Sequence, residues 1–152
     1  MLPSQIMATR LDVIATWKGK LAFTGKGHLD LSLPIDYIPP LGDDRGFMPL
    51  EMLLMSLAAC SGASVALLLG RAQQKVSGLE VRARAERRDE HPTIFTSIHL
   101  EFRLTGTAID PAAVEKTIAI SEERFCPVWA MLKPSVPITT SFVVEVGDGV
   151  GG

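Results

Sequence analysis

The feature that most constrains this chain is the run from Met52 to Leu69, which contains no charged side chain. Pro49 suits the first turn of a helix and Gly70 suits a C-terminal cap, so the pattern predicts one helix from Met48 to Gly70. A helix that is apolar on nearly every side must be surrounded either by protein or by lipid. The interpretation of the rest of the chain depends on which of the two surrounds it.

The same run is long enough to be considered as a membrane span. However, it also contains small and polar residues that a lone span would not favour, namely Ser56, Ser61, Gly62 and Ser64. The charges that flank it give no clear topology signal. Because other segments read as strands that need a covering helix, we predict a buried core helix and no membrane partner.

Length and charge limit the possible classes of protein. The chain has 152 residues, which predicts a single domain over residues 1–152. It carries 15 basic and 17 acidic residues without a basic run, so a nucleic-acid partner is not expected. The first fifteen residues lack the pattern of a secretory leader, which predicts a cytoplasmic protein. Cytosolic thiols are kept reduced, so the two cysteines are two buried thiols, a redox pair or half of a shared metal site.

Short strands are expected before the long helix. Alternation and turn residues predict strands at Leu11 to Trp17, Leu21 to Thr24 and Leu29 to Leu33, with a turn at Trp17 to Lys20. The segment from Pro34 to Gly46 is rich in proline and glycine and is expected to be a loop.

A long antiparallel hairpin is expected after the helix. Apolar and charged residues alternate from Leu79 to Glu86 and again from Ser97 to Leu104, with turn residues between them. The apolar face of this hairpin can pack on the central helix, and its charged face is most simply a solvated surface.

The last part of the chain predicts two more helices and a strand. Asp110 and Pro111 open a helix that runs to Phe125, and Cys126 and Pro127 open a short one. A final strand alternates from 136 to 146. This order of elements predicts an α+β fold. A helix that is apolar all round needs more cover than one sheet gives, so we predict that two such helices pack together in an obligate homodimer.

The two cysteines differ in their predicted surroundings. Cys60 lies in the middle of the long helix, where a lone cysteine is usually a small hydrophobe and where the helix dipole does little for its pKa. Cys126 stands at a helix N-cap, where free N–H groups favour a thiolate, so its pKa is expected to be the lower of the two. Cys126 is otherwise a simple capping residue. The cysteines are 66 positions apart, and spacing does not decide whether they meet.

Glu51 is the first-turn acid of the long helix. Either the helix dipole favours it there, or it orients a cation beside a thiol. Nine residues separate it from Cys60, which places the two side chains on opposite faces of a regular helix. Both serve one site only if Glu51 comes from a partner subunit or the helix is irregular. His28, His91 and His99 have no ligand spacing, and no nucleotide-binding fingerprint occurs, so neither a metal nor a cofactor is expected.

Two segments resemble the OsmC/Ohr family, the osmotically inducible and organic hydroperoxide resistance proteins. These segments are PLEMLLMSLAAC, which ends at Cys60, and SEERFCPV, which contains Cys126. The resemblance runs from about the first strand to the last, and the paired motifs are specific together. It implies an α+β fold in which antiparallel sheets pack on a long central helix, assembled as an intertwined homodimer.

The resemblance also implies an activity, the reduction of organic hydroperoxides and more weakly of hydrogen peroxide. By position, Cys60 matches the family's peroxidatic cysteine, Cys126 the resolving cysteine and Glu51 the glutamate near the site. A peroxide would oxidise Cys60 to a sulfenic acid, and Cys126 would then form a disulfide with it. An external dithiol would reduce that disulfide, as a lipoylated protein does in characterised relatives.

One departure from the family pattern concerns the positive charge at the site. Active members carry an arginine in the N-terminal strand and turn, where this chain has Lys18 and Lys20. Lysine lacks the planar, two-pronged donor of arginine, and Arg45 is a further candidate. The chain therefore looks closer to the OsmC-like branch. The alternative function is a redox sensor or small-molecule-binding protein with the same fold and little peroxidase activity.

Overall fold

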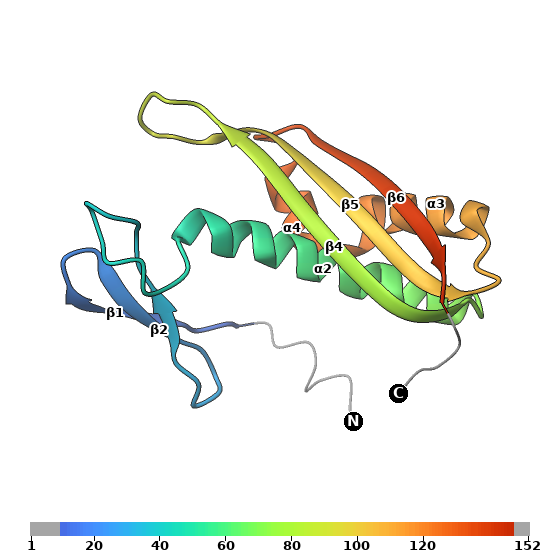
Figure 1. Ribbon diagram of the computed structural model, residues 1–152, viewed down its shortest axis with the longest axis horizontal. Coiled ribbons are helices and arrows are strands. Elements are labelled where there is room, and N and C mark those ends of the chain that lie inside the picture. The colour runs from blue at the N-terminus through green and yellow to red at the C-terminus, as the bar shows by residue number, and fades with distance from the viewer. Residues whose placement is uncertain (1–9, 148–152) are drawn as a thin grey trace. The chain divides into compact units, whose positions relative to one another are not determined.

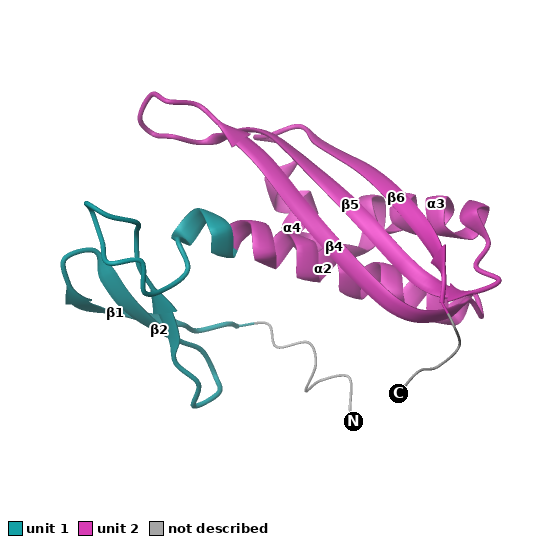
Figure 2. Cartoon of the chain, viewed as in Figure 1, with its two compact units in different colours: residues 1–52 teal, residues 53–152 magenta. Residues whose placement is uncertain are grey.

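The computed structural model describes residues 10–147. Most of the first fifteen residues, for which no secretory leader was predicted, therefore lie outside the described residues. The fold has the α+β class expected from the sequence. The chain divides into two compact units, Met1–Met52 and Leu53–Gly152 (Figure 2), and each is described by itself. The elements follow in the order β1 (Ile14–Gly19), β2 (Ala22–Lys26), β3 (Leu33–Ile35), α2 (Pro49–Arg71), β4 (Lys75–Arg87), β5 (Phe95–Thr107), α3 (Pro111–Ile120), the π-helical turn η1 (Ser121–Phe125), α4 (Pro127–Leu132) and β6 (Ile138–Val146).

The first unit contains a three-stranded antiparallel sheet in the order β1-β2-β3. The expected turn between its first two strands is confirmed, because Gly19 and Lys20 both take positive φ angles, of 110° and 48°. The third strand was predicted too early, since β3 begins only at Leu33. Leu29 and Leu31 are 56 % and 69 % exposed, so their alternation with polar residues buries no face in this chain.

A buried carboxylate holds the loop that precedes α2. The side chain of Asp36 accepts hydrogen bonds from the backbone N–H groups of Tyr37, Asp43 and Arg45, at 2.8, 3.1 and 3.3 Å. These donors, the Tyr37 N–H first among them, lower the pKa of Asp36 despite its burial. Lys20 Nζ forms an ion pair with Asp43 at 2.8 Å in the same unit.

Helix α2 confirms the predicted central helix. Its end is different from the expectation, because Gly70 lies inside the last turn and Gln73 takes the left-handed conformation at φ 56°. Its buried positions recur at helical spacing and form one stripe: Leu57, Ser61, Gly62, Val65 and Leu69. A Cβ atom on Gly62 would lie 3.0 Å from Val81 Cγ2, so glycine permits a close approach between α2 and β4.

The second unit contains a three-stranded sheet in the order β4-β5-β6, with helices on one of its faces (Figure 1). The predicted hairpin is confirmed, since β4 and β5 are antiparallel and pair from Lys75↔Thr107 to Arg87↔Phe95. Strand β6, however, runs parallel to β5, which corrects the expectation of antiparallel sheets. The reason is that α3, η1 and α4 form a crossover connection, which returns the chain to the starting end of β5.

The apolar side of this sheet and the helices share one core. Its fully buried members include Leu57, Val65 and Leu69 of α2, Leu100, Phe102 and Leu104 of β5, and Val114 of α3. On the other side of α2, Met55 and Leu67 remain 43 % and 50 % exposed. The described residues of a single chain therefore cover only part of this helix.

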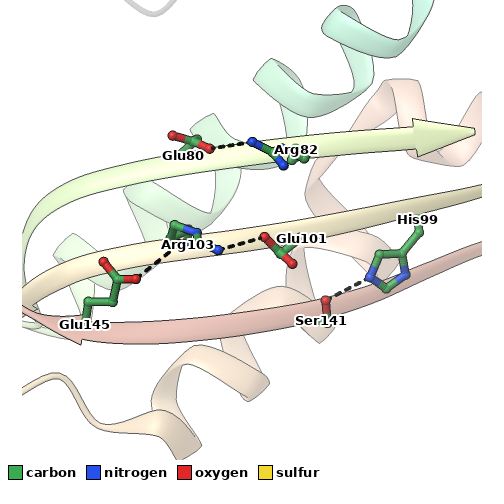
Figure 3. A network of polar contacts seen from close by, with 7 residues as sticks. All are labelled: Glu80, Arg82, His99, Glu101, Arg103, Ser141 and Glu145. Atoms are coloured by element: carbon green, nitrogen blue, oxygen red, sulfur yellow. Dashed lines mark hydrogen bonds and ion pairs between the residues drawn. The ribbon is translucent and has the colours of Figure 1, made fainter.

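The outer side of the sheet is polar, as expected (Figure 3). Arg103 bridges Glu101 and Glu145, at 3.4 and 3.2 Å, so these charges satisfy one another. Beside them, the two ring nitrogens of His99 lie 2.7 Å from Thr139 Oγ1 and 2.8 Å from Ser141 Oγ.

Among the described residues, one helix is long and apolar enough to cross a membrane by length and composition. It is α2, with a mean hydropathy of 2.1 over its most apolar window. Core helices of soluble proteins have the same property, and the buried stripe of α2 is part of the core described above.

Candidate functional site

Cys126 lies in the core between the π-helical turn η1, which continues α3, and the short helix α4. Asp110 caps α3 as predicted, because its side chain accepts a hydrogen bond from Ala112 N at 3.0 Å. The helix then widens in η1, and Cys126 N–H donates to Ser121 O at 2.9 Å, a bond that spans five residues. Such single π-helical turns occur frequently at functional sites. The sequence had predicted an ordinary helix up to Phe125.

Cys126 is the N-cap residue of α4, which confirms the prediction from the Cys-Pro pair. Its backbone is extended (φ −84°, ψ 102°), and its Sγ accepts a hydrogen bond from Trp129 N at 3.4 Å. Pro127 occupies the first helical position, where its missing N–H costs nothing. The side chain is buried, with 2 % of its surface exposed.

A second polar contact to Cys126 comes from α2. Ser61 Oγ lies 3.3 Å from Cys126 Sγ, and Ser61 is itself 1 % exposed. In the sequence, Ser61 is recognisable only as a polar residue in an apolar run. Its signal was present, because a hydroxyl on the buried side of a core helix needs a hydrogen-bond partner, but the sequence does not say which one.

Cys60, the residue before Ser61, completes the arrangement. It is half-buried, and the backbone N–H of Val128 and the side chain of Cys126 both lie near enough to its thiol to influence its pKa. Both cysteines are free thiols. The structure therefore brings together the two thiols that the sequence could not place relative to each other.

Burial is the main influence on the Cys60 thiol. Loss of solvent raises the pKa of Cys60 above its ordinary value, the N–H of Val128 opposes this rise, and Cys126 adds to it. No basic side chain of the described residues is among these causes. The thiolate is the nucleophilic form of cysteine, so its formation at Cys60 calls for a positive charge from outside this arrangement.

Glu51 has a local structural role in this chain. Its Oε2 accepts a hydrogen bond from Met48 N–H at 2.9 Å, which is the return bond of a capping box at the start of α2. Helix α2 is α-helical from Pro49 to Arg71, so the expectation that Glu51 and Cys60 project from opposite faces holds.

The three candidate cations lie in the first unit. Lys20 is held by Asp43, and the backbone of Arg45 is held by Asp36, while Lys18 is exposed. Among residues 10–147, no group of three or more His, Cys, Asp or Glu side chains is placed to hold a metal ion.

Comparison with known sequences identifies the family. The sequence model of the OsmC-like proteins matches residues 42–141, which include both cysteines and most of the second unit. The chain belongs to the OsmC-like protein family. Protein YhfA of Escherichia coli K12 is 40 % identical over 101 residues, which is 66 % of this chain and 75 % of YhfA.

Solved structures agree with this assignment of the OsmC-like fold. The OsmC-like protein of Mycoplasma pneumoniae has a TM-score of 0.80 at 20 % identity, over 91 % of this chain and 99 % of that one. An organic hydroperoxide resistance protein of Legionella pneumophila has a TM-score of 0.69 at 15 % identity, over 91 % and 100 % of the two chains. At these identities the likeness concerns the fold alone.

Proposed function

We propose that this OsmC-like protein is a thiol-dependent peroxidase that reduces organic hydroperoxides, and hydrogen peroxide more weakly. The observation that carries the proposal is the meeting of Cys60 and Cys126, two free thiols from distant parts of the chain, beside a buried serine. The family includes organic hydroperoxide resistance proteins, such as the one from Legionella pneumophila. The apolar surroundings of Cys60 suit an organic substrate better than a small polar one.

The proposed chemistry uses the two thiols in sequence. The Cys60 thiolate attacks the terminal peroxide oxygen and the O–O bond breaks, so Cys60 becomes a sulfenic acid. The departing alkoxide takes a proton from solvent and leaves as an alcohol. The Cys126 sulfur then attacks the Cys60 sulfur, water leaves, and a disulfide forms. An external dithiol, for example on a lipoylated protein, reduces the disulfide by exchange.

Exposure supports this division of roles. Cys60 is half-buried and within reach of a substrate, whereas Cys126 is almost fully buried and held by Ser61 and Trp129 N–H. A buried thiol that is fixed next to the first sulfur is suited to close a disulfide rather than to meet a peroxide from solution.

We propose that a partner subunit activates Cys60. We propose a homodimer, because α2 leaves Met55 and Leu67 exposed in the single chain. A cation at Cys60 would come from Lys18, Lys20 or Arg45, with a glutamate such as Glu51 of the second copy to orient it. A cytoplasmic location, in which a dithiol reductant is available, belongs to the same proposal.

The first experiment is mass spectrometry of the reduced protein within seconds of adding one equivalent of cumene hydroperoxide at neutral pH. The expected result is a loss of about 2 Da, mapped to a Cys60–Cys126 link. Cys60→Ser should show no rapid reaction, and Cys126→Ser should stop at a sulfenic acid or oxidise further. A wild-type mass that stays unchanged for minutes contradicts the proposal.

One observation favours a second candidate function, a binding or sensing protein with little peroxidase activity. Burial raises the pKa of Cys60, and no described cation opposes it. The pH dependence of Cys60 alkylation by iodoacetamide, measured in Cys126→Ser, separates the two functions. A midpoint above the ordinary thiol pKa of 9.0 favours the binding protein. A midpoint below neutral pH shows that a positive charge reaches the thiol and favours the peroxidase.

A further inference from the structure

Strand β6 lies at the edge of the second sheet, and half of its backbone polar groups point away from its neighbour. Within residues 10–147 it pairs only with β5, in parallel. Pro137 O accepts a hydrogen bond from Ile98 N, so the odd-numbered residues of this strand face β5. Successive residues of a strand direct their N–H and C=O groups to opposite edges. The N–H and C=O groups of Thr140 and Phe142 therefore point outward, where they can pair with another strand.

This free edge borders a preformed groove. An open pocket of about 380 Å³ lies between β6 and α3, which contacts β6, and Glu122 of η1 also lines it. This volume is within the usual range of ligand sites. Its lining residues are Glu115, Ile118, Ala119, Glu122, Thr140, Ser141 and Phe142. A chain that pairs with the edge would thus lie against a shaped, partly apolar wall.

The negative charge of the groove favours a positively charged ligand. The lining contains two carboxylates and no basic residue, and neither Glu115 nor Glu122 forms an ion pair with a described residue. Burial raises the pKa of Glu122, a hydrogen bond with Thr140 opposes this rise, and the charge of Glu123 adds to it. A partly buried carboxylate without a cation is costly, and a cation from a ligand would remove that cost. On the outer face of the sheet, by contrast, Glu145 is already paired with Arg103 (Figure 3).

We propose that this groove binds an extended basic peptide, which adds a strand to β6 and places lysine or arginine side chains on Glu115 and Glu122. This mode of recognition takes affinity from main-chain hydrogen bonds and specificity from alternate side chains. The two glutamates are two helical turns apart, about 10 Å along the axis, and every second side chain of a strand repeats at about 7 Å. Long basic side chains at every second position can reach both carboxylates.

The test uses a fluorescein-labelled heptapeptide of alternating threonine and lysine, with fluorescence anisotropy on the reduced full-length protein at low salt. We expect saturable binding that weakens with added salt, and no binding of the matching threonine and glutamate peptide. Glu115→Gln and Glu122→Gln should each raise the Kd about fivefold or more, which corresponds to losing one charge-assisted contact. Glu145→Gln, on the other face of the same strand, should leave the Kd unchanged.

Hydrogen exchange distinguishes strand addition from simple charge attraction. The amides of Thr140 and Phe142 should exchange quickly in the free protein and slow when the peptide is added. Equal Kd values for Glu122→Gln and Glu145→Gln overturn the proposal, and so does peptide binding without slowing of these amides. Amides that are already protected in the free protein would mean that a second copy covers the edge, which also overturns it. No peroxide is present, so the outcome is independent of the thiol chemistry.

Discussion

Ser61→Ala tests whether the serine hydroxyl fixes the position of the Cys126 thiol. The change removes one hydrogen bond between two buried side chains, Ser61 Oγ and Cys126 Sγ at 3.3 Å, and leaves Cys126 with the N–H of Trp129. A typical buried hydrogen bond contributes about 1 kcal/mol net to the free energy of unfolding. Alanine is also a better helix former than serine, by about 0.5 kcal/mol, which partly offsets the loss.

Ser64→Ala provides a matched control on the same helix. Ser64 Oγ donates to the carbonyl of Cys60 at 3.1 Å, within the helix itself, and the residue is only partly buried. The gain in helix propensity is common to both variants, so their difference compares the loss of the buried contact with Cys126 with the loss of a partly buried bond inside the helix. We expect Ser61→Ala to be the less stable of the two by about 1 kcal/mol in urea denaturation, or ~2–4 °C in Tm.

The same comparison reports on the proposed reaction. If Ser61 fixes Cys126 next to Cys60, closure of the disulfide after one equivalent of peroxide should be about fivefold slower in Ser61→Ala than in Ser64→Ala, which corresponds to about 1 kcal/mol. Stopped-flow quenching with mass spectrometry measures this rate. Equal stability and equal closure rates in the two variants would refute the assignment of a positioning role to Ser61.

Three further predictions concern the scaffold. Backbone donors lower the pKa of Asp36, so its contribution to stability is present above the ordinary pKa of 3.8 and disappears as the pH falls through the lowered pKa of the folded state. Asp36→Asn should abolish this part of the pH dependence of the urea midpoint. Glu51→Ala should cost about 0.5–1 kcal/mol of unfolding free energy through loss of the capping bond, whereas Glu51→Gln, which keeps an acceptor, should cost less; thermal unfolding of the pair would show no difference if the bond does not matter. Phe102→Ala, at a position 1 % exposed in β5, should cost ~3–5 kcal/mol, and Phe125→Ala, at a position 43 % exposed, much less; similar losses would contradict the assigned core.

The sequence predicted those elements whose cause is local. Asp110 and Cys126 each precede a proline, and both cap helices in the structure, because the cap needs only neighbouring residues. The alternation on both sides of the β4–β5 turn likewise predicted the hairpin, since adjacent strands find each other through a short connection. The apolar run likewise predicted α2, because the helix depends on the residues within the run itself.

Features that depend on contacts between distant parts of the chain could not be predicted from the sequence. The direction of β6 follows from a crossover of three helical segments, and its alternation reads the same in a parallel or an antiparallel pair. The segment before Cys126 forms a π-helical turn, and no residue type in Ser121–Phe125 predicts that conformation. The contact between Ser61 and Cys126 joins two elements through tertiary packing, so spacing alone gives no information about it.

The parallel pairing of β6 with β5 also has a consequence for the order of folding. The β4–β5 hairpin can form early because its contacts are close in sequence, whereas pairing of β6 must wait for α3, η1 and α4 to bring the chain back along β5. Cys126 lies within that returning segment, and Cys60 lies before the hairpin. The contact between the two thiols therefore joins segments on either side of the hairpin, so the thiol pair depends on long-range packing of the same kind that places β6 beside β5.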